Sequence, residues 1–250
     1  MSPDLYVLEV VSKYNVPTAP ALKASQDFAD VIRGWTRRYL LAQVVTGSYA
    51  KGTRVKGGTD IDLVLSVGPR TPGTMNKIYD NLFSYMRAKG YKAQRRCVSV
   101  SVVTEGFKLD LIPARVQWGT SGNHEIYVTA SDKTQVVNFN DQTKYVRDSK
   151  WTKEIRALKI WRNLRGLDFP SYLLELIVLQ SLANAEPQSH ARNLISVLKH
   201  VGQHIEDKPI MDPTNTHNAV SDCLNADKKR AVALAARQSV EQTDLRKIIW

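Results

Sequence analysis

The sequence predicts an α+β protein, with a mixed sheet backed by helices in its first part and a helical second part. Two observations predict this arrangement. Short apolar runs with strand-like alternation follow one another up to about residue 129. From about residue 152, apolar residues recur at helical spacing instead, and prolines separate the runs. We therefore expect a sheet-containing lobe over residues 1–150 and a helical lobe over residues 151–250.

The elements follow in chain order from the same periodicities. A first helix is expected over residues 20–39, because Phe28, Ile32 and Trp35 recur at helical spacing. A second helix is expected over residues 74–89, ended by Gly90. The expected strands are 41–46, 60–67, 97–104, 107–116 and 125–129. The helices expected in the second part are 152–165, 171–184, 190–202 and 226–248.

A Gly-Ser pair followed by two alternating aspartates is the most informative feature. Gly47 and Ser48 end the first apolar run, and a glycine-rich basic segment leads from them to Asp60 and Asp62. Residues i and i+2 of a strand point to the same face, so these two carboxylates should lie together. Paired carboxylates suit Mg²⁺. The N–H groups and hydroxyl of a Gly-Ser turn suit a triphosphate, and Lys51 would add positive charge.

A third carboxylate, Asp110, lies within the expected strand 107–116. An aspartate in an apolar strand is costly to bury without a partner, and a metal ion shared with Asp60 and Asp62 would supply one. Two-metal phosphoryl-transfer sites share carboxylates between ions roughly 3.5–4 Å apart. The sequence therefore predicts two Mg²⁺ ions, with Mn²⁺ as the alternative, held by these three residues.

Simpler interpretations of the same residues exist. Gly47-Ser48 fits a plain turn after a strand. Asp60 and Asp62 fit the solvated face of an edge strand. Asp110 fits a salt bridge with a basic neighbour, either Lys108 or Arg115.

A series of segments resembles the DNA polymerase β-like nucleotidyltransferases, and covers the chain from about residue 45 to about residue 220. More narrowly, it resembles the branch that contains bacterial CD-NTases, cyclic GMP-AMP synthases, oligoadenylate synthetases and archaeal-type CCA-adding enzymes. In the family's order, the segments are G-S-Y-A-K-G-T (47–53), D-I-D (60–62), L-D-L-I-P-A (109–114), L-K-I-W (158–161), P-S-Y-L-L-E-L (170–176) and I-M-D-P-T-N-T-H-N-A-V (210–220).

The resemblance implies a polymerase β-like catalytic lobe over 1–150 and a helical lobe over 151–250 that closes the nucleotide cleft. It also implies that Lys159 and Ser171 contact the donor phosphates and that Tyr172 stacks on a base. Without the resemblance, Lys159 fits an exposed helical lysine. Ser171 then fits a helix N-cap, and Tyr172 a core residue.

Composition agrees with an intracellular nucleotide-handling protein. The 250-residue chain has a formal net charge of +11, which favours polyanionic partners: nucleoside triphosphates, with RNA or DNA as an alternative acceptor or activator. Cys97 and Cys223 give neither a metal-ligand spacing nor a disulfide framework, so we expect reduced thiols. The N-terminus lacks a basic segment before its apolar residues, and no apolar run is long enough to cross a bilayer. We expect a cytoplasmic protein without a membrane partner, and the sequence does not indicate its oligomeric state.

The function expected is template-independent nucleotidyl transfer with release of pyrophosphate. The leading product is a cyclic or linear oligonucleotide signal, made by a bacterial CD-NTase in antiviral defence. One alternative is the addition of nucleotides to RNA, as CCA-adding enzymes do, or to DNA 3′ ends, or the synthesis of short oligomers. A non-catalytic nucleotide or nucleic-acid sensor is the other alternative. Antibiotic-modifying nucleotidyltransferases share the Gly-Ser and D-x-D segments but not the later ones, and rank lower.

Overall fold

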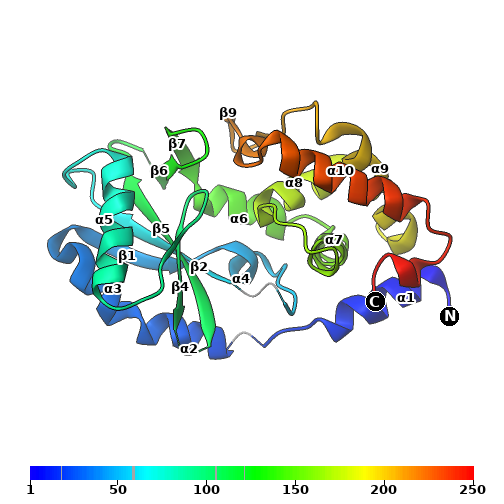
Figure 1. Ribbon diagram of the computed structural model, residues 1–250, viewed down its shortest axis with the longest axis horizontal. Coiled ribbons are helices and arrows are strands. Elements are labelled where there is room, and N and C mark those ends of the chain that lie inside the picture. The colour runs from blue at the N-terminus through cyan, green and yellow to red at the C-terminus, as the bar shows by residue number, and fades with distance from the viewer. Residues whose placement is uncertain (18, 58–59, 105, 121) are drawn as a thin grey trace. The chain divides into compact units, whose positions relative to one another are not determined.

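The computed structural model describes residues 1–17, 19–57, 60–104, 106–120 and 122–250 (Figure 1). The chain divides into two compact units by its contacts. The first unit comprises Met1–Val16, Gly52–Gly58 and Tyr145–Trp250, and the second comprises Pro17–Lys51 and Thr59–Lys144. The N-terminal segment and the segment after Lys51 thus pack with the C-terminal helices. The functional division into lobes 1–150 and 151–250 stays a prediction.

The second unit contains a seven-stranded mixed sheet, as predicted. The core order is β1-β2-β5-β4-β3, and β6 pairs with β5 and β7. β2 and β5 run parallel, and the other described pairs are antiparallel. The strands are β1 (Leu40–Val45), β2 (Ile61–Val67), β3 (Gln94–Arg95), β4 (Val100–Thr104), β5 (Phe107–Val116), β6 (Asn123–Val128) and β7 (Lys133–Asn138).

The helix expected over residues 20–39 is wrong as a single element. The chain forms two helices separated at Phe28, and then a 3₁₀ turn in which Arg37 has a φ of 45°. Apolar spacing continues across Phe28, so periodicity alone does not reveal the break. The helices of this part of the chain are α2 (Ala19–Asp27), α3 (Ala29–Thr36), α4 (Gly47–Lys51), α5 (Met75–Ala88) and α6 (Phe139–Arg147).

Alternating residues of β2 and β5 divide the sheet into two faces. One face contributes Ile61, Leu63 and Leu109 to a core shared with helices α3 and α5. The opposite face contributes Val64 and Ile112 to a smaller cluster with β6 and β7. Strand alternation therefore places the aspartates of β2 and β5 on the face away from α3 and α5.

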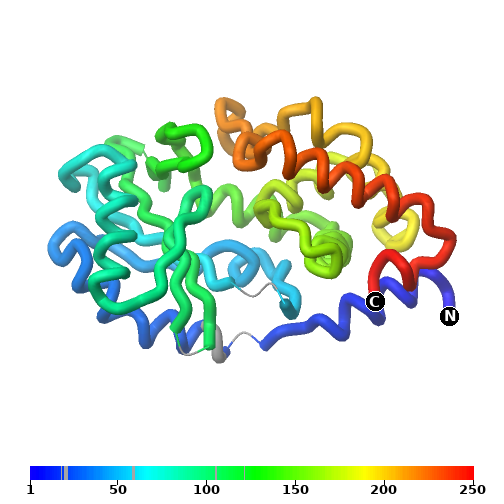
Figure 2. Tube along the Cα trace, viewed as in Figure 1, coloured from blue at the N-terminus to red at the C-terminus, as the bar shows by residue number. Residues whose placement is uncertain are grey.

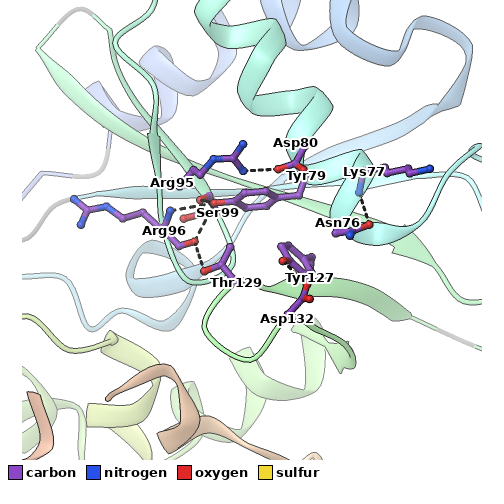
Figure 3. Close-up of polar contacts among 10 residues, drawn as sticks. All are labelled: Asn76, Lys77, Tyr79, Asp80, Arg95, Arg96, Ser99, Tyr127, Thr129 and Asp132. Atoms are coloured by element: carbon purple, nitrogen blue, oxygen red, sulfur yellow. Dashed lines mark hydrogen bonds and ion pairs between the residues drawn. The ribbon is translucent and has the colours of Figure 1, made fainter. Parts of the chain in front are cut away.

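Tyr79 of α5 fixes the segment that leads into β4 (Figure 3). Its hydroxyl oxygen lies 2.8 Å from the carbonyl oxygen of Ser99 and 3.0 Å from that of Arg96, and it accepts the Arg96 N–H at 3.1 Å. The ring is fully buried and makes an edge contact with Tyr127, at 5.5 Å between centroids. β4 is thereby held in place beside β5.

The first unit is mainly helical, as predicted for residues 151–250. The helix expected to reach residue 248 ends at Val240, and a 3₁₀ turn over Leu245–Lys247 follows. Tyr6 donates its hydroxyl to the carbonyl of Ile249 at 2.8 Å, so both termini lie side by side (Figure 2). The elements are α1 (Pro3–Lys13), α7 (Thr152–Leu164), α8 (Ser171–Ser181), α9 (His190–His204), β8 (Met211–Asp212), β9 (Asn215–Ala219), the 3₁₀ turn Val220–Cys223 and α10 (Ala226–Val240).

Two further expectations concern the setting of the chain. Neither Cys97 nor Cys223 is a free thiol in the structure, so the prediction of reduced thiols is wrong here. The separation of two cysteines along a chain does not define their chemical state. Within the described ranges, every helix is too short or too polar to traverse a bilayer.

Candidate active site

Asp62 and Asp110 occupy matching positions on neighbouring parallel strands. β2 and β5 pair in a register that sets Asp62 opposite Asp110. Partners across a sheet present their side chains to the same face, so the two carboxylates lie side by side. Asp60 directly precedes β2, and its charge acts on Asp110. The second unit thus pairs Asp62 with Asp110, and Asp60 lies at the start of the same strand region.

Gly47 packs directly against Asp62. The N–H of Thr46 donates to the carbonyl of Asp62 at 2.9 Å, which joins the end of β1 to β2. Gly47 has a φ of +61°, and a Cβ built on it would lie 1.7 Å from Asp62 Oδ2. Only glycine fits this position. The chain continues into the short helix α4, with Ser48 and Lys51 buried, so the plain-turn interpretation is wrong.

Asp110 is a partly buried carboxylate with one buried, unpaired oxygen among the described residues. Its Oδ1 atom is buried and has no hydrogen-bond partner among the described residues, and Ser101 lies opposite it on β4. Burial raises the pKa of Asp110 and the charge of Asp60 adds to the rise, whereas Ser101, Lys108 and Arg96 act in the opposite direction. A buried carboxylate oxygen without a hydrogen-bond partner, such as Asp110 Oδ1, is suited to bind a cation.

The salt-bridge interpretation of Asp110 is wrong. Lys108 forms its ion pair with Asp60, and Arg115 forms its ion pair with Glu125 at 2.6 Å. Both basic neighbours on β5 therefore pair with carboxylates other than Asp110.

The donor atoms at this position fit a magnesium ion. All three side chains offer carboxylate oxygens, the ligands that Mg²⁺ prefers, and Asp110 Oδ1 needs a partner. In the described part of the chain, however, no three His, Cys, Asp or Glu side chains are grouped as they would be around an ion. Asp60 is instead paired with the ammonium group of Lys108.

Lys159 lies in the first unit, in a buried ion pair. Its Nζ donates to Glu175 Oε1 at 2.7 Å and to Thr53 Oγ1 at 2.8 Å, and Thr53 donates to Glu175 at 2.7 Å. The Lys159 and Glu175 side chains are only 2% and 1% exposed, so the exposed-lysine interpretation is wrong. Three segments of the family resemblance therefore meet in this cluster.

Ser171 and Tyr172 begin helix α8 in the same unit. Ser171 is the first helical residue and accepts a hydrogen bond from Arg162 Nη1 at 3.1 Å. The N-cap is Pro170, so the N-cap interpretation of Ser171 is wrong. Tyr172 donates its hydroxyl to Asp212 Oδ1 at 2.9 Å, and burial and this carboxylate raise the pKa of Tyr172. The Ser-Tyr and Asp-Pro segments are thereby joined.

Sequence reasoning assigned no role to Glu175 or Ser101, and considered Lys108 only as a salt-bridge partner of Asp110. Glu175 stands within the Ser-Tyr segment, but its pairing with Lys159 depends on the packing of α7 against α8. Ser101 lies opposite Asp110 in the antiparallel pair of β4 and β5. Lys108 shares a strand face with Asp110, but its ion-pair partner Asp60 directly precedes the neighbouring strand β2.

No protein-family model matches the chain, and a comparison with curated proteins finds no match. Solved structures do match it over most of its length. CdnC of E. coli MS115-1 with ATP is 16% identical, with 93% of this chain and 90% of that chain covered and a TM-score of 0.72. The CD-NTase CdnG of Bradyrhizobium diazoefficiens in complex with GTP is 15% identical, with 96% and 91% covered and a TM-score of 0.71.

The CdnE cyclic dinucleotide synthase of Elizabethkingia meningoseptica with GTP and Apcpp is 12% identical, with 95% and 97% covered and a TM-score of 0.61. At these identities the likeness concerns the fold. The chain shares the fold of these CdnC, CdnG and CdnE structures, in agreement with the fold that its motifs predict.

Proposed function

We propose that this chain is a metal-dependent, template-independent nucleotidyltransferase that joins nucleoside triphosphates and releases pyrophosphate. One observation carries the proposal. The parallel register of β2 and β5 sets Asp62 opposite Asp110, with Asp60 directly before β2 and Gly47 packed against the Asp62 carboxylate. This arrangement supports a divalent-ion site next to a Gly-Ser phosphate-binding segment.

Asp60, Asp62 and Asp110 would hold two Mg²⁺ ions, or Mn²⁺ in their place. Bound there, the ions would neutralise the phosphate charge and lower the pKa of an acceptor ribose hydroxyl. Asp110 would accept the proton of that hydroxyl as it attacks the α-phosphate.

Ser48 and the backbone at Gly47 would bind the β- and γ-phosphates, with Lys51 contributing positive charge. As the resemblance implies, Ser171 would contact the donor phosphates and Tyr172 would stack on a base. Lys159 is engaged by Glu175 and Thr53, so its contribution to phosphate binding would include holding the Thr53 segment in place.

The product we propose is a cyclic or linear oligonucleotide signal, made by a bacterial CD-NTase in antiviral defence. The match to CdnC, CdnG and CdnE structures over more than nine-tenths of this chain supports this class, and all three were solved with ATP or GTP. ATP and GTP are therefore the first substrates to test.

Nucleotide addition to an RNA or DNA 3′ end is the second candidate, and the net charge of +11 favours it. A non-catalytic sensor is disfavoured, because nucleotide sensing alone does not require Asp62 and Asp110 to be paired across neighbouring strands with Asp60 directly before β2.

An incorporation assay tests the proposal. The protein would be incubated with Mg²⁺ or Mn²⁺ and radiolabelled nucleotides, singly and mixed, with and without tRNA or a DNA oligomer. We expect a small phosphatase-resistant product without added acceptor, abolished in Asp60→Asn/Asp62→Asn. Labelling of the added polymer alone would support terminal transfer. The absence of any incorporation, with ATP and GTP binding retained in calorimetry, would support the sensor.

A further inference from the structure

Lys108 forms an ion pair with one of the three aspartates, Asp60. Its Nζ pairs with Asp60 Oδ2, and both side chains are partly exposed, at 30% and 39%. The charge of Lys108 also lowers the pKa of Asp110. One ammonium group therefore acts on carboxylates at both ends of the cluster.

This ion pair accounts for two observations that otherwise conflict. The strand register pairs Asp62 with Asp110, and Asp60 directly precedes β2, yet the described residues show no three-carboxylate group arranged around an ion. Adjacent carboxylates repel one another unless a positive charge lies between them. Lys108 supplies such a charge by pairing with Asp60. Asp110 Oδ1 has no hydrogen-bond partner among the described residues.

We propose that Lys108 is an internal counter-ion that holds Asp60 in the metal-free protein and is displaced from it when a divalent cation binds. The inference rests on the proposed function, since it concerns the same carboxylates. Lys108 then stabilises the metal-free cluster and lowers its apparent affinity for divalent ions. Its partial exposure allows the long side chain to move into solvent without disturbing the core.

Mn²⁺ binding followed by electron paramagnetic resonance, which needs no catalysis, tests this directly. Lys108→Met removes the ammonium group but keeps the apolar stem, and Lys108→Arg restores a positive charge. We expect Lys108→Met to bind Mn²⁺ about five-fold more tightly than the wild type, since a partly exposed ion pair no longer competes. Lys108→Arg should return the affinity toward the wild-type value.

Arg96→Gln is the matched control. Arg96 also acts on Asp110 through its charge, but it forms no ion pair with Asp60 in the described structure. If counter-ion exchange is correct, the effect of Lys108→Met exceeds that of Arg96→Gln. Equal effects would show a general field of positive charge and overturn the proposal.

A double-mutant cycle tests the ion pair in the metal-free protein. Lys108→Met should lower the melting temperature in the wild-type background and leave it unchanged in the Asp60→Asn background. In a different outcome, Mn²⁺ depends on Asp62 for binding and yet binds Lys108→Met and the wild type with equal affinity. That result would reject the role of Lys108 but not the proposed metal site. Absence of Mn²⁺ binding in every variant would reject the proposed function, and with it the exchange.

Discussion

Gly47 packs so closely against Asp62 that there is no room for a larger residue at position 47. A Cβ on Gly47 would lie 1.7 Å from Asp62 Oδ2 and 2.6 Å from its Cγ. The glycine of the Gly-Ser segment thus fixes the position of one of the aspartates, besides permitting the positive φ with which helix α4 begins. The two halves of the motif form one structural unit.

Gly47→Ala should displace the Asp62 carboxylate and strain the backbone. We expect a loss of about 2 kcal/mol or more in the free energy of unfolding, measured in urea, together with a loss of Mn²⁺ affinity. Gly52→Ala is the control, because Gly52 has a φ of +72° but no atom within 4 Å of the added Cβ. It should show only the backbone cost, about 1 kcal/mol. Equal effects of the two substitutions would refute the close contact.

Lys159→Met should leave the buried Glu175 carboxylate without its counter-ion. Breaking a buried ion pair in this way costs about 3–5 kcal/mol, so we expect a large fall in stability in urea denaturation. The double variant Lys159→Met/Glu175→Leu should recover part of the loss. The exposed pair Lys228–Asp168 provides the control, and Lys228→Met should cost under about 1 kcal/mol. A mild effect of Lys159→Met would show that the pair contributes little to folding.

Tyr172→Phe separates the two contributions of Tyr172. The variant loses the hydrogen bond to Asp212, which should cost about 1.5–3 kcal/mol because the acceptor is charged. It keeps the aromatic ring, so nucleotide affinity measured by calorimetry should be retained if the ring stacks on a base. Tyr172→Ala should lose that affinity. Equal nucleotide affinity in both variants would contradict a stacking role.

His124 predicts a pH dependence of stability. Burial lowers the pKa of His124 below its ordinary value of 6.5. Its Nδ1 donates to the carbonyl of Gly122 at 3.0 Å, and Nε2 accepts from Ser66 Oγ at 2.9 Å, so the neutral form is the one that fits. The unfolded chain takes up a proton at a higher pH than the folded chain. The stability contributed by neutral His124 is therefore complete above about pH 6.5 and is lost as the pH falls below it.

His124→Gln should reduce this loss. Melting temperatures measured from about pH 8 to pH 5 should fall less steeply in the variant than in the wild type. The exposed His217→Gln is the control and should follow the wild-type curve. Parallel curves for wild type and His124→Gln would show that His124 does not contribute.

Local patterns predicted most of the sheet. The strand expected at residues 107–116 has the bounds found for β5, because its alternation is long and regular. Helices α1, α4 and α6 were not predicted. β-Branched residues interrupt the helical preference of α1, and α4 has only five residues and starts with glycine.

The candidate site was predictable only in part. The three aspartates could be selected because carboxylates at alternate positions, or within an apolar strand, indicate a metal site from the local sequence alone. The pairing of Lys108 with Asp60 and of Lys159 with Glu175 could not, because both depend on which strands or helices become neighbours. The parallel pairing of β2 with β5 is a non-local property, and it decides which carboxylates meet.

Anomalous diffraction from crystals grown with Mn²⁺ and a non-hydrolysable nucleoside triphosphate tests the central claim most directly. We predict two manganese peaks, both within coordination distance of carboxylate oxygens of Asp60, Asp62 and Asp110, with the triphosphate at Gly47 and Ser48 and the Lys108 ammonium released from Asp60. Manganese bound to other residues, or a triphosphate bound without manganese at these aspartates, would contradict the account.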